Sequence, residues 1–430
     1  MKPLTSNLDI VTAEAELWKT WRSRFNPGFS SRNIMALLPD LIEDVAKFAN
    51  VLEGLAGEGN TWGPVFQLKE KATNLTFDSI CKITFGIGFN QQSVNTDTPL
   101  KAAILYQIHL MATGSDSLQG LVYRRTPWHK AMIDKNNRII ENLIKPLIHA
   151  NLQEESNNSH IKTVVELAFR NINRSETTLD LSPSQPDARL MDIIISNIKA
   201  FIFAGQDTTA STICFLFKNL QDNQECLRRL RAEHDAVLGP DQDKIAEILT
   251  ADRHLIYNLP YTLGVIKETL RLYPLASTAR QGSPDMFLTV PNSPTRYPLD
   301  GFAPWIAVAS IHQSPDYWDR PTEFLPERWM RDEKDPLYPR KDAWMPFSLG
   351  PRSCIGMELA LVELKLVCIF TARTLSIEEA WAHWDEKRGS QATPGHVVNG
   401  RRLYEVDTGP VQPKDGMPVH VKLREKTSRL

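Results

Sequence analysis

Cysteine, net charge and long apolar runs are all scarce in this sequence. Its 430 residues include five cysteines, and 49 Lys and Arg side chains against 51 Asp and Glu leave a formal net charge of −2. This balance excludes the basic face with which proteins bind nucleic acids. The cysteines are odd in number, widely spaced and form no CxxC pair, so the sequence suggests neither a disulfide framework nor a thiolate zinc site. The apolar share of 42% is that of a folded globular chain, so disorder is excluded as well.

The amino end lacks an apolar segment of the length that a signal peptide or a membrane anchor needs. Inside the chain, the apolar density of residues 191–220 approaches that of a membrane span. Lys199, Asp207 and a cluster of Thr and Ser argue against burial in lipid, because a charged group is costly there. We therefore predict a long helix through the middle of a soluble protein. Gly205 and adjacent Thr residues weaken this helix over 204–209, which we interpret as a local distortion at a ligand site.

Through most of the chain, apolar residues recur at every third or fourth position, the spacing of one helical face. This spacing predicts helices over Ile34–Leu55, Phe66–Ile87, Arg138–Leu152, Lys199–Leu220, Asp222–Leu238, Tyr261–Leu272 and Met357–Leu375. Residues 151–189 are rich in Ser, Asn and Pro, which is typical of a surface connection with one short helix inside it. After Pro274, frequent prolines predict short strands and loops, and the alternating stretches 397–406 and 417–423 predict a terminal hairpin. The predicted fold class is mainly α with a minor β component toward the carboxyl end.

The strongest chemical signal is the segment FSLGPRSCIG, which is followed at once by a helical run. Gly350 and Gly356 let the backbone turn tightly and approach a flat ligand closely. Cys354 stands just before a helix N-terminus, where the helix dipole favours a thiolate. Arg352 is near enough to meet an acidic group on a metal carrier, and Phe347 can shield the sulfur from water. The residues alone leave three interpretations open: a thiolate metal ligand, a buried structural cysteine and a catalytic nucleophile, although no His lies nearby in sequence to serve as a base.

The same segment matches, at every fixed position, the heme-binding signature F-x-x-G-x-R-x-C-x-G, and on it the chain resembles the cytochrome P450 family. Further motifs of that family precede this segment, and they occur along nearly the whole chain in the order that the family has. AGQDTT at 204–209 resembles the oxygen-activating stretch of the central helix, ETLR at 268–271 the E-x-x-R motif, and PERW at 326–329 the segment between that motif and the cysteine. Trp18 to Arg22 is similar to the W-x-x-x-R helix that contacts a heme propionate. The stretches FNPGFS and KETLRLYP resemble fungal microsomal members of secondary metabolism.

Two of these motifs also have a plainer interpretation. Glu268 and Arg271 face the same side of a helix, where such pairs are usually surface salt bridges. The resemblance implies instead that they form, with Arg328, a buried network that holds the cysteine loop. Trp18 and Arg22 are one helical turn apart and, without the other motifs, would be an exposed aromatic–cation pair.

Asp207 and Thr208 place an acid beside an alcohol in an otherwise apolar helix. In the plainer interpretation the Asp is solvated and the Thr bonds back to a carbonyl one turn earlier. Unsatisfied polar groups are costly in apolar surroundings, so we expect water near them. The resemblance implies that the pair relays protons during dioxygen cleavage.

The resemblance implies a heme-thiolate monooxygenase that inserts one oxygen atom from O2 into a small apolar organic substrate, in fungal secondary metabolite biosynthesis. Its cofactor would be heme b, with the Cys354 thiolate on the iron. Electrons would come from NADPH-cytochrome P450 reductase, and an intact member would lie on the cytosolic face of the endoplasmic reticulum membrane. The residues expected at the heme are Trp18, Arg22, Gly205, Phe347, Gly350, Arg352 and Gly356.

In that family a membrane anchor, helices and strands precede the W-x-x-x-R motif, which starts here at Trp18. We therefore expect one domain over residues 1–430 with the cytochrome P450 fold, but without the anchor, the first helices and part of the β-sheet. For the chain as written, this predicts a cytoplasmic location. Two functions follow as hypotheses: an active monooxygenase, and a non-catalytic or unstable heme-binding product of a truncated gene.

Overall fold

The computed structural model describes residues 2–112, 118–154, 162–170, 188–392, 396–407 and 411–424. Its helices are α1 (Lys2–Thr5), α2 (Ala15–Phe25), α3 (Ser31–Ala36), α4 (Leu38–Glu53), α5 (Leu68–Phe85), α6 (Pro99–Ala112), α7 (Leu118–Arg124), α8 (Pro127–Glu154), α9 (Val164–Arg170), α10 (Ala188–Asp222), α11 (Gln224–Leu238), α12 (Ile245–Ala251), α13 (Pro260–Leu272), α14 (Val308–His312), α15 (Met357–Thr371) and α16 (Trp381–Arg388). Its strands are β1 (Phe66–Gln67), β2 (Phe287–Thr289), β3 (Arg296–Pro298), β4 (Leu375–Glu379), β5 (Glu405–Asp407), β6 (Val411–Pro413) and β7 (Pro418–Leu423). Most of the predicted surface connection 151–189 lies outside the described residues, and its described part includes α9.

Helix α10 runs for 35 residues and packs against α5, α13 and α15. Its side chains are mostly buried, among them Ile198 and Leu216. Residues 204–209 are helical like their neighbours, so the distortion expected there does not interrupt the helix. Within the described ranges, no helix has both the length and the apolar composition that crossing a membrane requires.

The predicted helices are present, and local backbone chemistry explains where their ends differ. The predicted helix 34–55 is two helices, α3 and α4, and Pro39 stands in the first turn of the second. Helix α5 ends at Gly86, whose φ of 72° lies in the left-handed region that favours glycine. The helix predicted to reach Leu375 ends at Thr371, and β4 begins at Leu375.

The strand pairing differs from the predicted terminal hairpin. Strand β7 is the centre of an antiparallel sheet with the order β1-β7-β4, in which Val421 stands opposite Ile377. Strand β5 pairs instead with β6. The prediction that 397–406 and 417–423 form one hairpin is therefore wrong. The alternation in β7 reflects pairing with strands that are distant in sequence, and it buries Val419 and Val421 completely.

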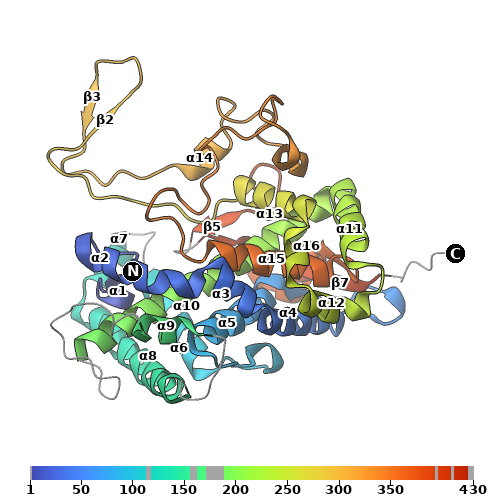
Figure 1. The fold of residues 1–430 in the computed structure, drawn as a ribbon, viewed down its shortest axis with the longest axis horizontal. Coiled ribbons are helices and arrows are strands. Elements are labelled where there is room, and N and C mark those ends of the chain that lie inside the picture. The colour runs from blue at the N-terminus through green and yellow to red at the C-terminus, as the bar shows by residue number, and fades with distance from the viewer. Residues whose placement is uncertain are drawn as a thin grey trace.

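The proline-rich region after α13 leaves the helical body as extended chain. Figure 1 shows β2 and β3 as a hairpin at the far end of this excursion, away from the helices. Helix α14 and a short 3₁₀-helix, Pro326–Met330, follow before the chain returns to α15. Because α15 packs against α10, the cysteine segment that precedes α15 is brought close to the centre of the molecule.

Candidate functional site

The cysteine segment is a closed turn in front of α15. The backbone N–H of Cys354 donates to the carbonyl of Phe347 at 2.8 Å, and that of Ser353 donates to the carbonyl of Gly350 at 3.0 Å. Gly350 has a φ of 76°, a left-handed conformation that glycine adopts without strain. Gly356 is the N-cap residue of α15, so the cysteine stands just before a helix N-terminus.

A cavity of about 300 Å³ lies between this turn and the middle of α10. Cys354, Phe347 and Arg352 line it from the turn, and Thr208 and Thr212 line it from α10. The apolar part of its wall includes Leu270, Leu275, Ile306, Val308 and Leu364. A thiol and several hydroxyl-bearing side chains, among them Thr208, therefore share one cavity in largely apolar surroundings.

The electrostatics of the turn centre on Cys354, which is exposed to the cavity although protein atoms surround its sulfur closely. This burial raises the pKa of the Cys354 thiol, whereas the N–H of Gly356 and the guanidinium of Arg22 lower it. Burial also lowers the pKa of Arg22, and the nearby Cys354 raises it. Since burial dominates at the sulfur, a thiolate here calls for a further positive charge, which a bound metal ion would supply.

Helix α2 brings further predicted residues to the turn. Arg352 Nη2 donates to the carbonyl of Ala13 at 2.8 Å. The guanidinium carbon of Arg352 lies 4.6 Å from the centre of the Trp18 ring. Trp18 and Arg22 are both half-buried. Two guanidinium groups and an indole ring therefore gather beside the cysteine turn.

These donors fit a heme. In the part of the chain that the structure describes, no group of three or more His, Cys, Asp or Glu side chains could hold a bare metal ion. The lone thiol of Cys354 therefore suits an iron that a macrocycle already holds. Arg22 and Arg352 are cations suited to carboxylates such as propionates, and the apolar cavity wall suits a flat apolar ring.

Asp207 lies outside this cavity, between α10 and α5. Its carboxylate accepts hydrogen bonds from the ammonium of Lys69 and, at 3.1 Å, from Nε2 of Gln412. Gly205 also faces α5, because a Cβ built on it would lie 3.0 Å from Cγ1 of Ile80. The acid and the alcohol that are adjacent in the sequence therefore have different surroundings, and Gly205 serves the close packing of two helices.

Two residues that contact this acid were not predicted from the sequence. Lys69 and Gln412 lie 138 and 205 positions from Asp207 in the chain, and no local pattern links such distant residues. Gln206 is only 1% exposed, and its amide nitrogen and oxygen have no partner among the described residues. A buried amide is costly without hydrogen bonds, so this position is suited to hold an internal water molecule.

Glu268, Arg271 and Arg328 form a network in which each residue is 0% exposed. Nη2 and Nε of Arg271 donate to the two carboxylate oxygens of Glu268 at 2.9 and 3.0 Å, and Nε of Arg328 donates to Oε1 at 3.0 Å. Complete burial excludes the surface salt bridge that the sequence also allowed. Arg271 donates further to the carbonyls of Pro321 and Glu323, at 2.6 and 2.9 Å. The network therefore ties α13 to the irregular segment that precedes the cysteine turn.

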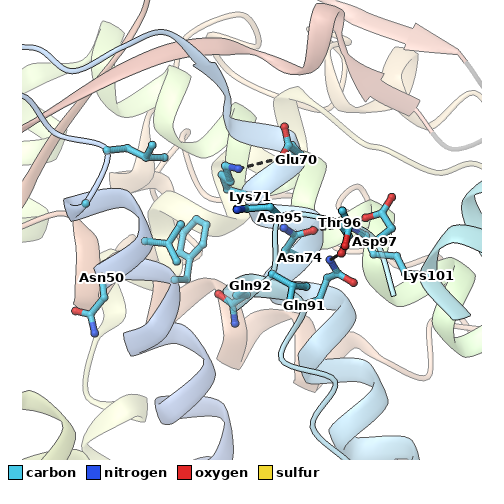
Figure 2. Close-up of a pocket in the computed structure, with 15 residues that line it drawn as sticks. Asn50, Glu70, Lys71, Asn74, Gln91, Gln92, Asn95, Thr96, Asp97 and Lys101 are labelled. Atoms are coloured by element: carbon cyan, nitrogen blue, oxygen red, sulfur yellow. Dashed lines mark hydrogen bonds and ion pairs between the residues drawn. The ribbon is translucent and has the colours of Figure 1, made fainter. Parts of the chain in front are cut away.

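Another cavity, of about 520 Å³, lies beside α4, α5 and the loop before α6, and Figure 2 shows the polar side chains around it. Nζ of Lys101 donates to Oδ1 of Asp97 at 2.6 Å and also to Asn74. Nζ of Lys71 donates to Oε1 of Glu70 at 2.9 Å. These charged groups already satisfy one another, and neither Cys nor His is among the residues that line this cavity. The cavity that contains Cys354 is therefore the stronger candidate for chemistry.

Comparisons with known proteins agree with this geometry. The sequence profile of the cytochrome P450 family matches residues 3–391. The chain is 34% identical over 425 residues to the cytochrome P450 monooxygenase polC of Polytolypa hystricis, covering 98% of this chain and 74% of that protein. It is 28% identical over 445 residues to the cytochrome P450 monooxygenase acrF of Aspergillus aculeatus, covering 99% and 86%.

Among solved structures, the fold is similar to the crystal structure of the cytochrome P450DA heme domain. The TM-score is 0.74 at 18% sequence identity, and the match covers 100% of this chain and 82% of that one. This likeness shows the mainly α fold that the sequence predicted. The chain therefore belongs to the cytochrome P450 family of oxidoreductases, which use heme, O2 and electrons from a reductase partner.

Proposed function

We propose that this protein is a heme-thiolate monooxygenase that inserts one oxygen atom from O2 into a small apolar organic substrate. The observation that carries the proposal is the cavity shared by the Cys354 thiol and the Thr208 hydroxyl, with Arg22 and Arg352 beside the thiol. The names of the two fungal relatives, both monooxygenases, support the same reaction class.

Cys354 would hold the heme iron through its sulfur. When bound, the heme supplies the redox chemistry by which O2 is reduced and a C–H bond is oxidised. Phe347 lines the same cavity and would keep water away from the sulfur. Further residues assigned to the heme are Trp18, Arg22 and Arg352 at the propionates and Gly350 and Gly356 in the turn. Gly205 would act indirectly, through the packing of α10 on α5.

Thr208 and Asp207 would relay protons to the cavity during the cleavage of O2. The hydroxyl of Thr208 lines the cavity and donates to the carbonyl of Ala204 at 2.9 Å. Its oxygen lone pairs are therefore available to accept a hydrogen bond from water in the cavity. The carboxylate of Asp207 is held by Lys69 outside the cavity, so a proton that it takes up and passes on would travel to Thr208 through water and not by direct contact.

The cellular setting follows from family membership as part of the proposal. NADPH-cytochrome P450 reductase would deliver the electrons, at the cytosolic face of the endoplasmic reticulum, in fungal secondary metabolite biosynthesis. The wall residues Leu270, Leu275 and Val308 favour an apolar substrate, because polar groups would lose water there without gaining partners.

Reduction of the purified, heme-loaded chain under carbon monoxide tests the proposal. We expect the red-shifted absorption band of thiolate-ligated heme, and we expect Cys354→Ala to abolish it. Cys368→Ala is the control, because Cys368 is a fully buried cysteine of α15, and this variant should keep the band. A wild-type spectrum without the thiolate band would contradict the proposal. A band without product formation when reductase, NADPH and apolar compounds are added would favour a heme-binding protein without catalysis.

A further inference from the structure

His312, at the end of α14, connects the buried Glu–Arg–Arg network to the cysteine turn. Its Nδ1 lies 3.1 Å from the carbonyl oxygen of Arg271, and its Nε2 lies 2.9 Å from the backbone nitrogen of Met345. Nη1 of Arg271 donates in return to the carbonyl of His312 at 2.8 Å. The imidazole is completely buried. It therefore bridges two segments that lie 41 and 33 positions away in the chain.

The two hydrogen bonds of the ring are compatible with only one tautomer of the neutral imidazole. A carbonyl oxygen only accepts a hydrogen bond and a backbone N–H only donates one. Nδ1 of His312 must therefore carry the proton, and Nε2 must accept from Met345. Burial lowers the pKa of His312 to about 4, which keeps the ring neutral at neutral pH. A side chain at this position therefore needs a donor on one edge and an acceptor on the other.

Met345 stands two residues before Phe347, the first residue of the cysteine turn. Met345 lines the cavity, and its carbonyl accepts from the N–H of Ser348 at 3.0 Å. The carbonyl of Phe347 accepts from the N–H of Cys354 at 2.8 Å. The contact between His312 and Met345 thus starts a path of backbone hydrogen bonds that ends at Cys354.

We infer that His312 is a positioning residue for the thiolate ligand: its Nε2 holds the N–H of Met345 and thereby sets the place of Cys354 against the cavity. This inference rests on the proposed function, because the place of Cys354 matters most when its sulfur ligates the heme iron. It adds to the Glu268 network a defined link from α13 to the cysteine turn. Among the described residues, neither the guanidinium of Arg271 nor that of Arg328 donates a hydrogen bond directly to a residue of the cysteine turn.

Two substitutions of His312 test the hydrogen bonds at Nδ1 and at Nε2 separately. His312→Gln places an amide oxygen where Nε2 stands and keeps an acceptor for Met345. His312→Asn keeps a donor near Nδ1 and removes that acceptor. His234→Asn is the matched control, because His234 is also completely buried and its Nε2 lies 2.9 Å from Oγ1 of Thr262 in the neighbouring helix α13.

The first readout is amide hydrogen exchange at Met345 in the purified chain. We expect exchange to be about tenfold faster in His312→Asn, the ratio that corresponds to one lost hydrogen bond, and close to wild type in His312→Gln and His234→Asn. The second readout is the fraction of reduced, carbon-monoxide-bound heme that shows the thiolate band. We expect this fraction to fall in His312→Asn alone.

Unchanged exchange at Met345 in His312→Asn would overturn the inference, and so would equal losses in the Gln and Asn variants. Equal losses in the His234 control would also overturn it, because they would show a general effect of disturbing a buried histidine. If the wild-type chain shows no thiolate band, the proposed function fails, and exchange at Met345 still decides whether His312 holds the turn.

Discussion

The carboxylate of Asp207 is paired with the ammonium of Lys69 in the interface between α10 and α5. The two residues are 5% and 8% exposed, so the ion pair is largely removed from water. Removing two charges from water costs several kcal/mol, which their mutual attraction and further hydrogen bonds offset only while both partners remain. This pair joins the start of α5 to α10 at the residue next to Thr208.

Lys69→Met should lower the free energy of unfolding by about 3 kcal/mol, because it leaves a buried carboxylate without its countercharge. Adding Asp207→Asn should recover most of that loss, since the double variant contains no buried unpaired charge. Urea unfolding of the two single variants and the double variant measures the coupling. Losses that simply add would show that the two side chains are energetically independent.

Glu268→Gln should destabilise the fold by about 3–5 kcal/mol, because it removes the one carboxylate between two buried guanidinium groups. Glu225 and Arg228 have the same spacing on α11, but their side chains are 65% and 69% exposed. Glu225→Gln should therefore leave the unfolding transition nearly unchanged. Thermal unfolding of both variants at one pH compares their midpoint temperatures. Similar decreases in the two variants would contradict the claim that burial determines how much an ion pair contributes to stability.

Thr208→Ala should retain the thiolate band but slow product formation about a hundredfold while oxygen consumption continues, because a proton-transfer group in the cavity is lost. Thr250→Ala is the control. Thr250 is an exposed helical threonine that also bonds back to a carbonyl one turn earlier, at 2.6 Å. Parallel measurement of oxygen consumed and product formed gives the ratio. Coupled turnover in Thr208→Ala would remove this residue from the proton path.

Stability should fall as the pH rises from about 4.5 to about 8 through the titration of Glu363. Glu363 is 3% exposed, and its Oε1 has no partner among the described residues. Burial raises the pKa of Glu363 from 4.5 to about 8. Between these values the folded chain keeps this proton and the unfolded chain has lost it, so unfolding becomes more favourable by up to about 1.4 kcal/mol per pH unit.

Glu363→Gln removes this titration, so the variant should be more stable than wild type near the upper end of that range and similar to it near the lower end. Urea unfolding across the range measures the difference in slope between the two proteins. Parallel slopes would show that the carboxyl of Glu363 gains compensating interactions in its charged form.

Local patterns in the sequence determined the helices and the cysteine turn. The apolar period predicted Tyr261–Leu272 for a helix that spans Pro260–Leu272, because helical contacts reach only about one turn along the chain. The cysteine turn could also be predicted, because the residues that form it are close together in the sequence. Gly350 provides the left-handed residue and Gly356 the N-cap, and both lie within a few positions of Cys354.

Only the tertiary structure decided which distant segments meet. Asp207 and Thr208 are neighbours in sequence, yet successive helical residues point about 100° apart, so the packing of α5 on α10 decides that one contacts Lys69 and the other lines the cavity. The same holds for β7 between β1 and β4, whose alternation shows a half-buried strand but not its partners. The contact of His312 with Met345 is a third case, because a single hydrogen bond across 33 positions leaves no periodic trace in the sequence.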